Sequence, residues 1–239
     1  MSCRVFFLHG FLGRPSDWRP VQSQINLSST AIDLFGDERW SPQSSIRQWG
    51  PKFNSALEEA LGNQESEQNI LVGYSMGGRL ALGAFFADNS VWNKLILVSS
   101  NPGIESQEIS ERKKFDTQWA HRFLNEDWKS LIEAWNGQPV FHGSANEPLR
   151  LENDFRREDL AQALTNWSLS EQEDFRDRMD RKEILMVCGA QDQKYQKMAE
   201  ELKAKSPSLQ LQIVKGSGHR VLFDQPVELA KFVLDFSSY

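Results

Sequence analysis

The chain lacks the features that mark several large classes of protein. Only two of its 239 residues are cysteines, Cys3 and Cys188, which gives neither a disulfide framework nor the ligand spacing of a metal site. We expect both to be buried thiols on separate strands in a reducing cytoplasm. No apolar run approaches 18 residues, and the mean hydropathy is -0.54, so we expect no membrane-spanning helix. No secretory signal is expected, because a strand starts almost at residue 1.

Other features that the sequence lacks limit the kinds of ligand and partner that we expect. A net charge of -6 argues against a nucleic-acid ligand. The sequence contains no internal repeat and no low-complexity segment, and nothing in it indicates a cofactor or a metal. We therefore expect a cytoplasmic protein, monomeric or homodimeric, that acts on a small molecule.

The most informative motif is Gly73-Tyr74-Ser75-Met76-Gly77, which joins a short apolar run to a helix-like stretch. A serine between two glycines at a strand-to-helix corner is the nucleophile elbow of α/β-hydrolases. Such a pattern arises by chance in roughly one chain of this length in ten. Its interpretation therefore depends on the rest of the sequence.

A second element lies near the N-terminus. The apolar run Arg4–Leu8 ends in His9-Gly10-Phe11. In α/β-hydrolases a His-Gly pair at this place often marks the loop that supplies one N–H group of the oxyanion hole. We predict that the backbone N–H groups of Phe11 and Met76 form the oxyanion hole. The alternative is a tight strand exit without a catalytic task.

An acid and a base follow in the expected order. Asp192 comes just after the buried strand-like run 183–189, and His219 lies in a glycine-rich loop after the strand-like run 209–214. Open α/β sheets place their sites at such carboxyl ends of strands. We predict that His219 takes the proton from Ser75, while Asp192 fixes the histidine tautomer.

Four other residues compete for these roles. His121 and His142 have no strand before them and are interpreted as surface or lid residues. Asp33 ends a strand but precedes the serine, which breaks the expected order. Asp224 is interpreted as the start of the last helix.

These motifs predict an α/β-hydrolase fold with a mainly parallel sheet of about six strands and helices on both faces. We expect the N-terminal hairpin of the usual fold to be missing, because the first predicted strand starts at residue 3. We predict a core of residues 1–101 and 182–239, and a helical lid of residues 102–181 inserted after the strand that corresponds to the sixth conventional one. The predicted strands are 3–8, 29–34, 69–74, 93–99, 183–188 and 209–214, and the predicted lid helices are 106–124, 127–136, 155–166 and 170–178.

Arginines lie both on the elbow helix and in the lid, and those of the lid alternate with aromatic residues. Arg79 lies four residues after Ser75, on the same face of the elbow helix. Arg112, Phe115, Trp119 and Arg122 recur at helical spacing in the lid. Arginine binds carboxylates bidentately, so these residues indicate a substrate with several carboxylates. For Arg112, a surface ion pair with Asp116 at i+4 is an equal alternative.

Several stretches resemble the 2-succinyl-6-hydroxy-2,4-cyclohexadiene-1-carboxylate synthases of menaquinone and phylloquinone biosynthesis. The resemblance runs from residue 5 to about 226 and is carried by His9-Gly10-Phe11, GYSMGGR at 73–79, NPGI at 101–104, the lid stretches 111–124 and 135–141, CGAQD at 188–192, and Gly218-His219. The lid stretches are the most specific of these, because lids vary widely among α/β-hydrolases.

The resemblance implies a lyase that eliminates pyruvate, with Ser75, His219 and Asp192 acting as a general base. It implies that Arg79, Arg112 and a lid arginine bind the substrate carboxylates, and that Tyr74 and Trp135 shape the pocket. Arg150 fits the lid arginine best, with Arg156 and Arg157 as alternatives.

Two departures from the family pattern leave other functions open. The loop 33–40 lacks the family's usual turn, and region 142–158 is longer than in close relatives. The nearest rival is a serine hydrolase for an ester, thioester or carbon–carbon bond, which works through an acyl-enzyme. A binding protein on an inactivated scaffold is disfavoured, because all three triad residues are present in order.

Overall fold

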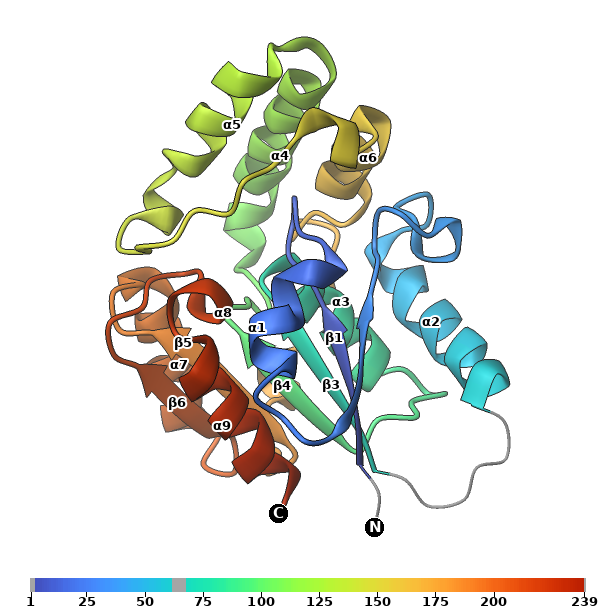
Figure 1. Cartoon of the computed structure of the whole chain (residues 1–239), viewed down its shortest axis with the longest axis vertical. Coiled ribbons are helices and arrows are strands. Elements are labelled where there is room, and N and C mark those ends of the chain that lie inside the picture. Colours follow the sequence, from blue (N-terminus) through green and yellow to red (C-terminus); the bar gives the residue numbers. More distant parts are fainter. Residues whose placement is uncertain (1–2, 62–67, 239) are drawn as a thin grey trace.

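The computed structural model describes residues 3–61 and 68–238, and its centre is one parallel sheet (Figure 1). Within the described residues the sheet has six strands in the order β2-β1-β3-β4-β5-β6. All neighbouring pairs are parallel. The strands are β1 (Cys3–Leu8), β2 (Ser28–Ile32), β3 (Gln68–Tyr74), β4 (Lys94–Val98), β5 (Ile184–Gly189) and β6 (Gln210–Val214). The predicted α/β-hydrolase sheet is therefore confirmed, with every boundary within two residues.

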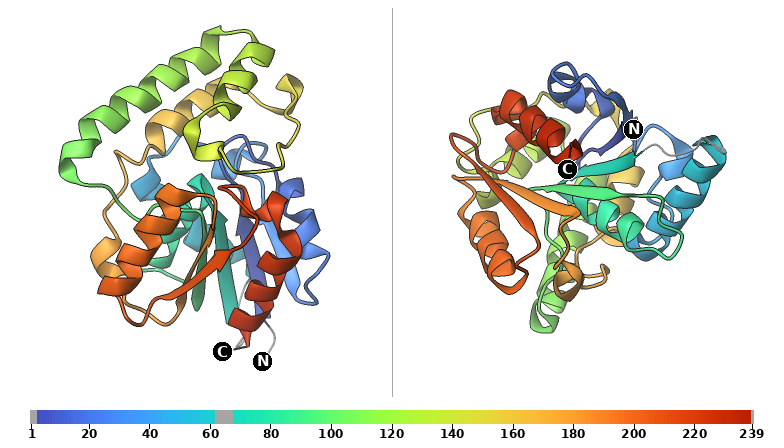
Figure 2. Two further views of the ribbon diagram at one scale, coloured as in Figure 1. Left: turned by 90° about the vertical axis from the view of Figure 1, so that its left-hand side faces the viewer. Right: turned by 90° about the horizontal axis from the view of Figure 1, so that it is seen from below.

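Helices cover both faces of this sheet, as the view from below shows (Figure 2). The α-helices are α1 (Arg19–Gln22), α2 (Ile46–Leu61), α3 (Met76–Phe85), α4 (Ile109–Asn125), α5 (Trp128–Asn136), α6 (Arg157–Asn166), α7 (Gln193–Lys205), α8 (Val221–Asp224) and α9 (Pro226–Ser237). Short 3-10 helices span Pro15–Trp18, Glu38–Trp40, Ser106–Glu108, Pro139–Phe141, Glu152–Asp154 and Arg176–Arg178.

Alternation along the strands divides the core into two layers. In β1, Phe6 and Leu8 pack in the layer with α2, α3 and α7, while Val5 and Phe7 pack in the layer with α1, α8 and α9. Successive strand residues point to opposite faces, and a parallel sheet is buried on both. This explains why the inner strands read as continuous apolar runs.

The segment between β4 and β5 stands apart from these layers. Its helices α4, α5 and α6 lie beyond the carboxyl ends of the strands, at the opposite end of the molecule from both termini (Figures 1 and 2). Trp119, Trp128 and Trp167 are buried there, whereas Trp135 is half-buried. The division into core 1–101 and 182–239 and lid 102–181 remains a prediction.

The predicted helix at 170–178 is wrong. Only Arg176–Arg178 forms a 3-10 turn, and the rest of the stretch is irregular. Its backbone instead follows the chain just after β4, because the Phe175 N–H donates to the Pro102 carbonyl at 2.9 Å. The Phe175 ring also stacks on Phe86, with centroids 5.3 Å apart. These tertiary contacts override a sequence that is rich in helix formers.

The two cysteines differ in their burial. Cys188 is buried and Cys3 is half-buried, so the expectation of two buried thiols holds fully only for Cys188. Burial raises the pKa of the Cys188 thiol to about 12.

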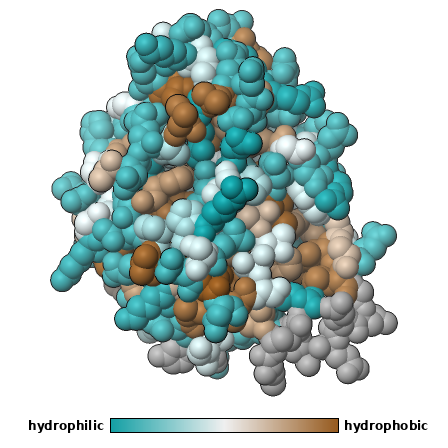
Figure 3. Space-filling view, viewed as in Figure 1, coloured by the Kyte–Doolittle hydropathy of each residue, from teal (hydrophilic) through white to brown (hydrophobic). Residues whose placement is uncertain are grey.

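None of the helices in residues 3–61 and 68–238 has the length and apolar character needed to cross a membrane. On the face in Figure 3, apolar residues form separate patches between hydrophilic ones.

Candidate active site

Ser75 lies at a strained corner between β3 and α3. Its φ of 51° and ψ of -112° place a non-glycine residue in the left-handed half of the backbone map. The corner is tight, because a Cβ on Gly77 would lie 2.4 Å from the His9 carbonyl oxygen. A Cβ on Gly73 would lie 2.4 Å from the Gly78 Cα. Both flanking glycines are therefore required by close backbone approach.

The three residues predicted as a triad lie in one hydrogen-bonded line. His219 Nε2 is 3.1 Å from Ser75 Oγ, and His219 Nδ1 is 2.7 Å from Asp192 Oδ2. His219 and Asp192 are 2 % and 4 % exposed, so the pair is shielded from water. In this arrangement the Nδ1–H donates to the carboxylate, which leaves Nε2 free to accept the serine proton.

The two competing acids have structural tasks. The Asp33 carboxylate accepts the backbone N–H groups of Phe35 and Gly36 and so closes the loop after β2. The Asp224 carboxylate accepts from the Gly218 N–H at 3.1 Å and from the Ala145 N–H at 3.1 Å. Neither carboxylate forms a hydrogen bond with His219 in the described part of the chain.

The predicted oxyanion donors lie beside the serine. Met76 is the first residue of α3, so its N–H has no carbonyl partner within the helix. Phe11 borders the same cavity as Ser75 and Met76. Its loop is held by His9, whose Nε2 accepts the Leu34 N–H at 3.0 Å and whose Nδ1 lies 2.9 Å from the Gly10 carbonyl oxygen. Complete burial lowers the pKa of His9 and keeps the ring neutral.

A cavity of about 720 Å³ opens above Ser75. Its walls come from the strand ends, from α4 and α5, and from the start of α7. Its lining residues include Phe11, Ser75, Met76, Arg79, Arg112, Phe115, Trp135, Gln138, Phe141, His142, Asp192, Lys194, Tyr195 and His219. His142, interpreted from the sequence as a surface or lid residue, thus borders the site. His121 lies on the exposed side of α4.

Arg79 brings a positive charge into this main cavity. Its guanidinium donates to the Trp167 carbonyl oxygen, a neutral partner. Burial, and to a smaller extent the neighbouring Arg112, lower its pKa to about 10. The guanidinium therefore stays protonated at pH 7. A buried cation without a hydrogen-bonded carboxylate attracts an anionic ligand.

Arg112 forms the i+4 ion pair that the sequence offered as one alternative and also lies at the cavity, while its binding of substrate stays a prediction. Its Nε donates to Asp116 Oδ2 at 2.8 Å, which is the i+4 pair, and its side chain also lines the main cavity. Asp116 is 2 % exposed, so this pair is partly buried rather than superficial. Ser168 Oγ donates to the same carboxylate oxygen at 2.6 Å. Asp116 is hydrogen-bonded to Arg112 and not to Arg79, and Lys194 lines the same cavity, so the wall has excess positive charge.

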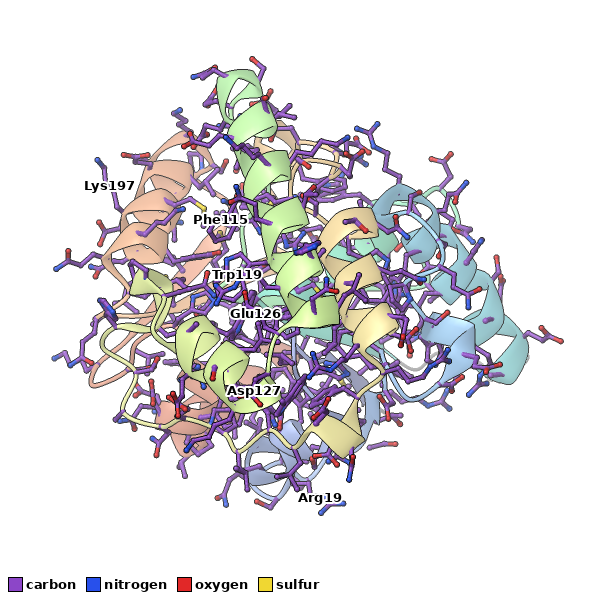
Figure 4. All side chains as sticks on the ribbon, turned by 90° about the horizontal axis from the view of Figure 1, so that it is seen from above. Arg19, Phe115, Trp119, Glu126, Asp127 and Lys197 are labelled. Atoms are coloured by element: carbon purple, nitrogen blue, oxygen red, sulfur yellow. The ribbon has the colours of Figure 1, made fainter. Side chains whose placement is uncertain are left out.

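Aromatic rings form the roof of the cavity. Trp135 packs on Phe11 with centroids 4.6 Å apart and edge-on against Trp119 at 4.9 Å. Viewed from above, Phe115 and Trp119 lie on the same side of α4 (Figure 4). Phe115 lines the cavity, whereas Trp119 is buried and stacks on Arg122 at 4.1 Å. Only half of the predicted basic and aromatic face of α4 therefore reaches the site.

The predicted lid arginines lie elsewhere than in the main cavity. Arg150 forms a bidentate ion pair with Asp17, at 3.0 and 2.7 Å, and borders a smaller cavity beside Ser75. Arg156 is exposed, 3.7 Å from Asp159. Arg157 bonds Glu152 and two backbone carbonyls of the lid. Tyr74 borders the smaller cavity as well.

Two residues at the site escaped the sequence analysis. The Tyr195 ring packs edge-on against His219 at 4.7 Å, and its N–H lies 3.4 Å from Asp192 Oδ1. Arg220 follows the histidine directly, is 6 % exposed and borders the smaller cavity. Their spacing from the triad residues was the available signal: three residues after Asp192, and one after His219.

Comparisons with known proteins agree with this geometry. Residues 5–232 match the model of the alpha/beta hydrolase family. The 2-succinyl-6-hydroxy-2,4-cyclohexadiene-1-carboxylate synthase of Citrobacter koseri is 30% identical over 231 residues, which cover 93% of this chain and 88% of the relative. A protein of Bacillus subtilis described as a putative synthase of the same kind is 28% identical over 248 residues, with 97% and 89% covered.

Solved structures add support for the fold alone. MenH from S. aureus superposes with a TM-score of 0.81 at 22% identity, covering 99% of this chain and 93% of that one. A malate-bound esterase from Thermogutta terrifontis gives a TM-score of 0.78 at 18% identity, with 99% and 89% covered. The chain therefore belongs to the alpha/beta hydrolase family and is, within it, an enzyme of the 2-succinyl-6-hydroxy-2,4-cyclohexadiene-1-carboxylate synthase family.

Proposed function

We propose that the protein is a carbon–oxygen lyase of menaquinone biosynthesis. It eliminates pyruvate from 2-succinyl-5-enolpyruvyl-6-hydroxy-3-cyclohexene-1-carboxylate and releases 2-succinyl-6-hydroxy-2,4-cyclohexadiene-1-carboxylate. The names of substrate and product define the electron flow. The proton on ring carbon 2 leaves, its electron pair forms the 2,3 double bond, and the old 3,4 double bond moves to 4,5. The bond from carbon 5 to oxygen breaks, and the enolpyruvate that departs becomes pyruvate after protonation on carbon.

Ser75 would remove the proton, supported by His219 and Asp192. The 3.1 Å contact between Ser75 Oγ and His219 Nε2 lets the imidazole take up the serine proton as the alcohol oxygen accepts one from carbon. Asp192, 2.7 Å behind the ring, stabilises the imidazolium that results. No acyl-enzyme is needed, because the substrate loses a proton and a leaving group and gains no water.

The negative charge that forms when the proton leaves must be stabilised by the protein. Proton loss beside the succinyl ketone turns that carbonyl into an enolate, whose oxygen would lie against the N–H groups of Phe11 and Met76. Each such donor is worth roughly 3–4 kcal/mol in the transition state. The strained elbow and the His9 hydrogen bonds hold these groups before substrate arrives.

One observation carries the proposal: the serine and histidine face a cavity lined by three cations and two carboxylates, and one of these carboxylates, Asp192, is already paired with His219. The three cations are Arg79, Arg112 and Lys194. The substrate bears three carboxylates, so it suits a wall formed by Arg79 and Arg112. Trp135 and Phe11 offer flat apolar surface for the ring. Residues 102–181 would act as the lid that closes the cavity above the core.

The test is an assay of the purified protein with the enolpyruvyl substrate, following the diene absorbance together with pyruvate. We expect equal amounts of diene and pyruvate, and loss of both in Ser75→Ala. The rival is a serine hydrolase with the same triad. It predicts no pyruvate, and a burst of nitrophenol from a p-nitrophenyl ester with Ser75 acylated.

A further inference from the structure

A second, smaller cavity adjoins Ser75. Its volume is about 60 Å³, against about 720 Å³ for the main cavity. The two cavities share Phe11, Ser75, Trp135 and Phe141, whereas Arg79 and Arg112 line only the main one. One water needs roughly 10–15 Å³ of such space. The smaller cavity therefore has room for about four to six water-sized groups, the size of a short acid.

Two arginines border this smaller cavity, and they differ in how their charge is balanced. Arg150 is neutralised by Asp17, with both side chains less than a tenth exposed. The guanidinium of Arg220 has neutral partners: the side-chain oxygen of Asn136, the backbone oxygen of Asn146, and the ring of Phe141 at 4.2 Å. Among the described residues, no carboxylate forms a hydrogen bond with it.

Burying an arginine that has only neutral hydrogen-bond partners lowers the stability of the folded protein. Arg220 is 6 % exposed, and burial lowers its pKa. Glu147 and Asp224 are near enough to oppose that shift weakly, but the Asp224 carboxylate already accepts backbone N–H groups. A buried charge is retained cheaply only when a partner charge is supplied. A bound carboxylate would be that partner.

We propose that the smaller cavity is a second anion subsite, in which Arg220 binds one carboxylate arm of the substrate. The inference rests on the proposed function. In that substrate the succinyl arm is on ring carbon 2 and the enolpyruvyl arm on carbon 5, directly across the ring. The two arms therefore point in opposite directions and need separate cations. Arg79 and Arg112 serve one arm in the main cavity, and Arg220 serves the other.

The test measures binding of two short acids, pyruvate and succinate, to the resting enzyme by calorimetry and by inhibition. In Arg220→Gln, one of the two acids binds at least about tenfold more weakly, a loss of about 1.4 kcal/mol. The same acid keeps its affinity in Arg112→Gln. If that acid is pyruvate, the subsite holds the enolpyruvyl arm, and if it is succinate, the subsite holds the succinyl arm.

Two further variants separate ligand binding from a structural task. Arg220→Lys keeps the charge but loses the planar fork, so its loss of affinity is smaller than that of Arg220→Gln. Arg157→Gln removes a lid arginine outside both cavities and leaves both affinities unchanged. The subsite is refuted if Arg220→Gln and Arg220→Lys melt at lower temperature yet bind both acids like wild type.

These readouts do not depend on turnover. If the protein releases no pyruvate from the enolpyruvyl substrate but Arg220→Gln still loses affinity for one acid, the proposed reaction fails and the anion subsite stands. If turnover proceeds and Arg220→Gln changes neither acid's affinity nor KM, the reaction stands and the subsite fails.

Discussion

The predicted core and the predicted lid contribute to the site in different ways. Ser75, Asp192 and His219 come from strand ends of the core and are held by backbone geometry and by one another. Arg112 and Trp135 come from α4 and α5 and are held by side-chain packing and ion pairs. The core thus holds the triad, and the lid adds a cation and aromatic surface to the arginines that the core itself places at the cavities.

The largest effect is expected from the core. Ser75→Ala or His219→Ala removes the base, so kcat falls by roughly three orders of magnitude or more while KM changes little. Steady-state kinetics with the enolpyruvyl substrate measures this, with thermal unfolding as the check on folding. Retention of a tenth of wild-type kcat in either variant would separate the triad from the chemistry.

The second largest effect is expected at the ion pair that connects the two regions. Arg150 in the lid segment pairs with Asp17 of the core, with both side chains largely buried. Arg150→Ala leaves the Asp17 carboxylate buried and unpaired, which lowers the free energy of unfolding by about 3–5 kcal/mol. Urea unfolding measures the loss. Arg156→Ala is the control, because that exposed residue should change stability by less than about 1 kcal/mol.

A smaller effect, on binding alone, is expected in the lid. Arg112→Ala removes a cation from the cavity wall, so KM rises by about 10- to 100-fold with kcat nearly unchanged, equivalent to about 1.4–2.7 kcal/mol. The matched control on the same helix is Arg122→Ala, whose partner is Glu126. A fall in kcat with unchanged KM in Arg112→Ala would erase the distinction between core and lid.

The smallest effect concerns pH. Burial lowers the pKa of His9, so the folded state resists a proton that the unfolded state binds below its own pKa of about 6.5. Stability therefore falls as pH drops below about 6.5, by at most about 1.4 kcal/mol per pH unit. His9→Gln should show a flatter slope between pH 7 and 5 in urea unfolding. Equal slopes would mean that His9 titrates normally.

The sequence predicted the core better than the lid, for physical reasons. Strand positions follow from apolar runs that a parallel sheet buries on both faces, and the elbow follows from glycines that no other residue can replace. The stretch 170–178 failed because the contact of Phe175 with Pro102 is long-range and leaves no local pattern.

The arginines show the same limit at the site. Arg79 lies on a regular helix, so its spacing from Ser75 predicted its direction. Arg150 and Arg220 lie outside such spacing, on irregular chain and at a helix cap. Arg150 is neutralised by Asp17, which lies 133 positions away in the sequence, whereas the hydrogen-bond partners of Arg220 among the described residues are neutral. No periodicity in the sequence records such a pair.

The most direct test of the account is a single-turnover comparison of the enolpyruvyl substrate with its form deuterated at ring carbon 2, while the mass of the intact protein is followed. The account predicts slower pyruvate release from the deuterated form and a protein mass that never changes. Equal rates for the two forms, together with an adduct on Ser75, would contradict it.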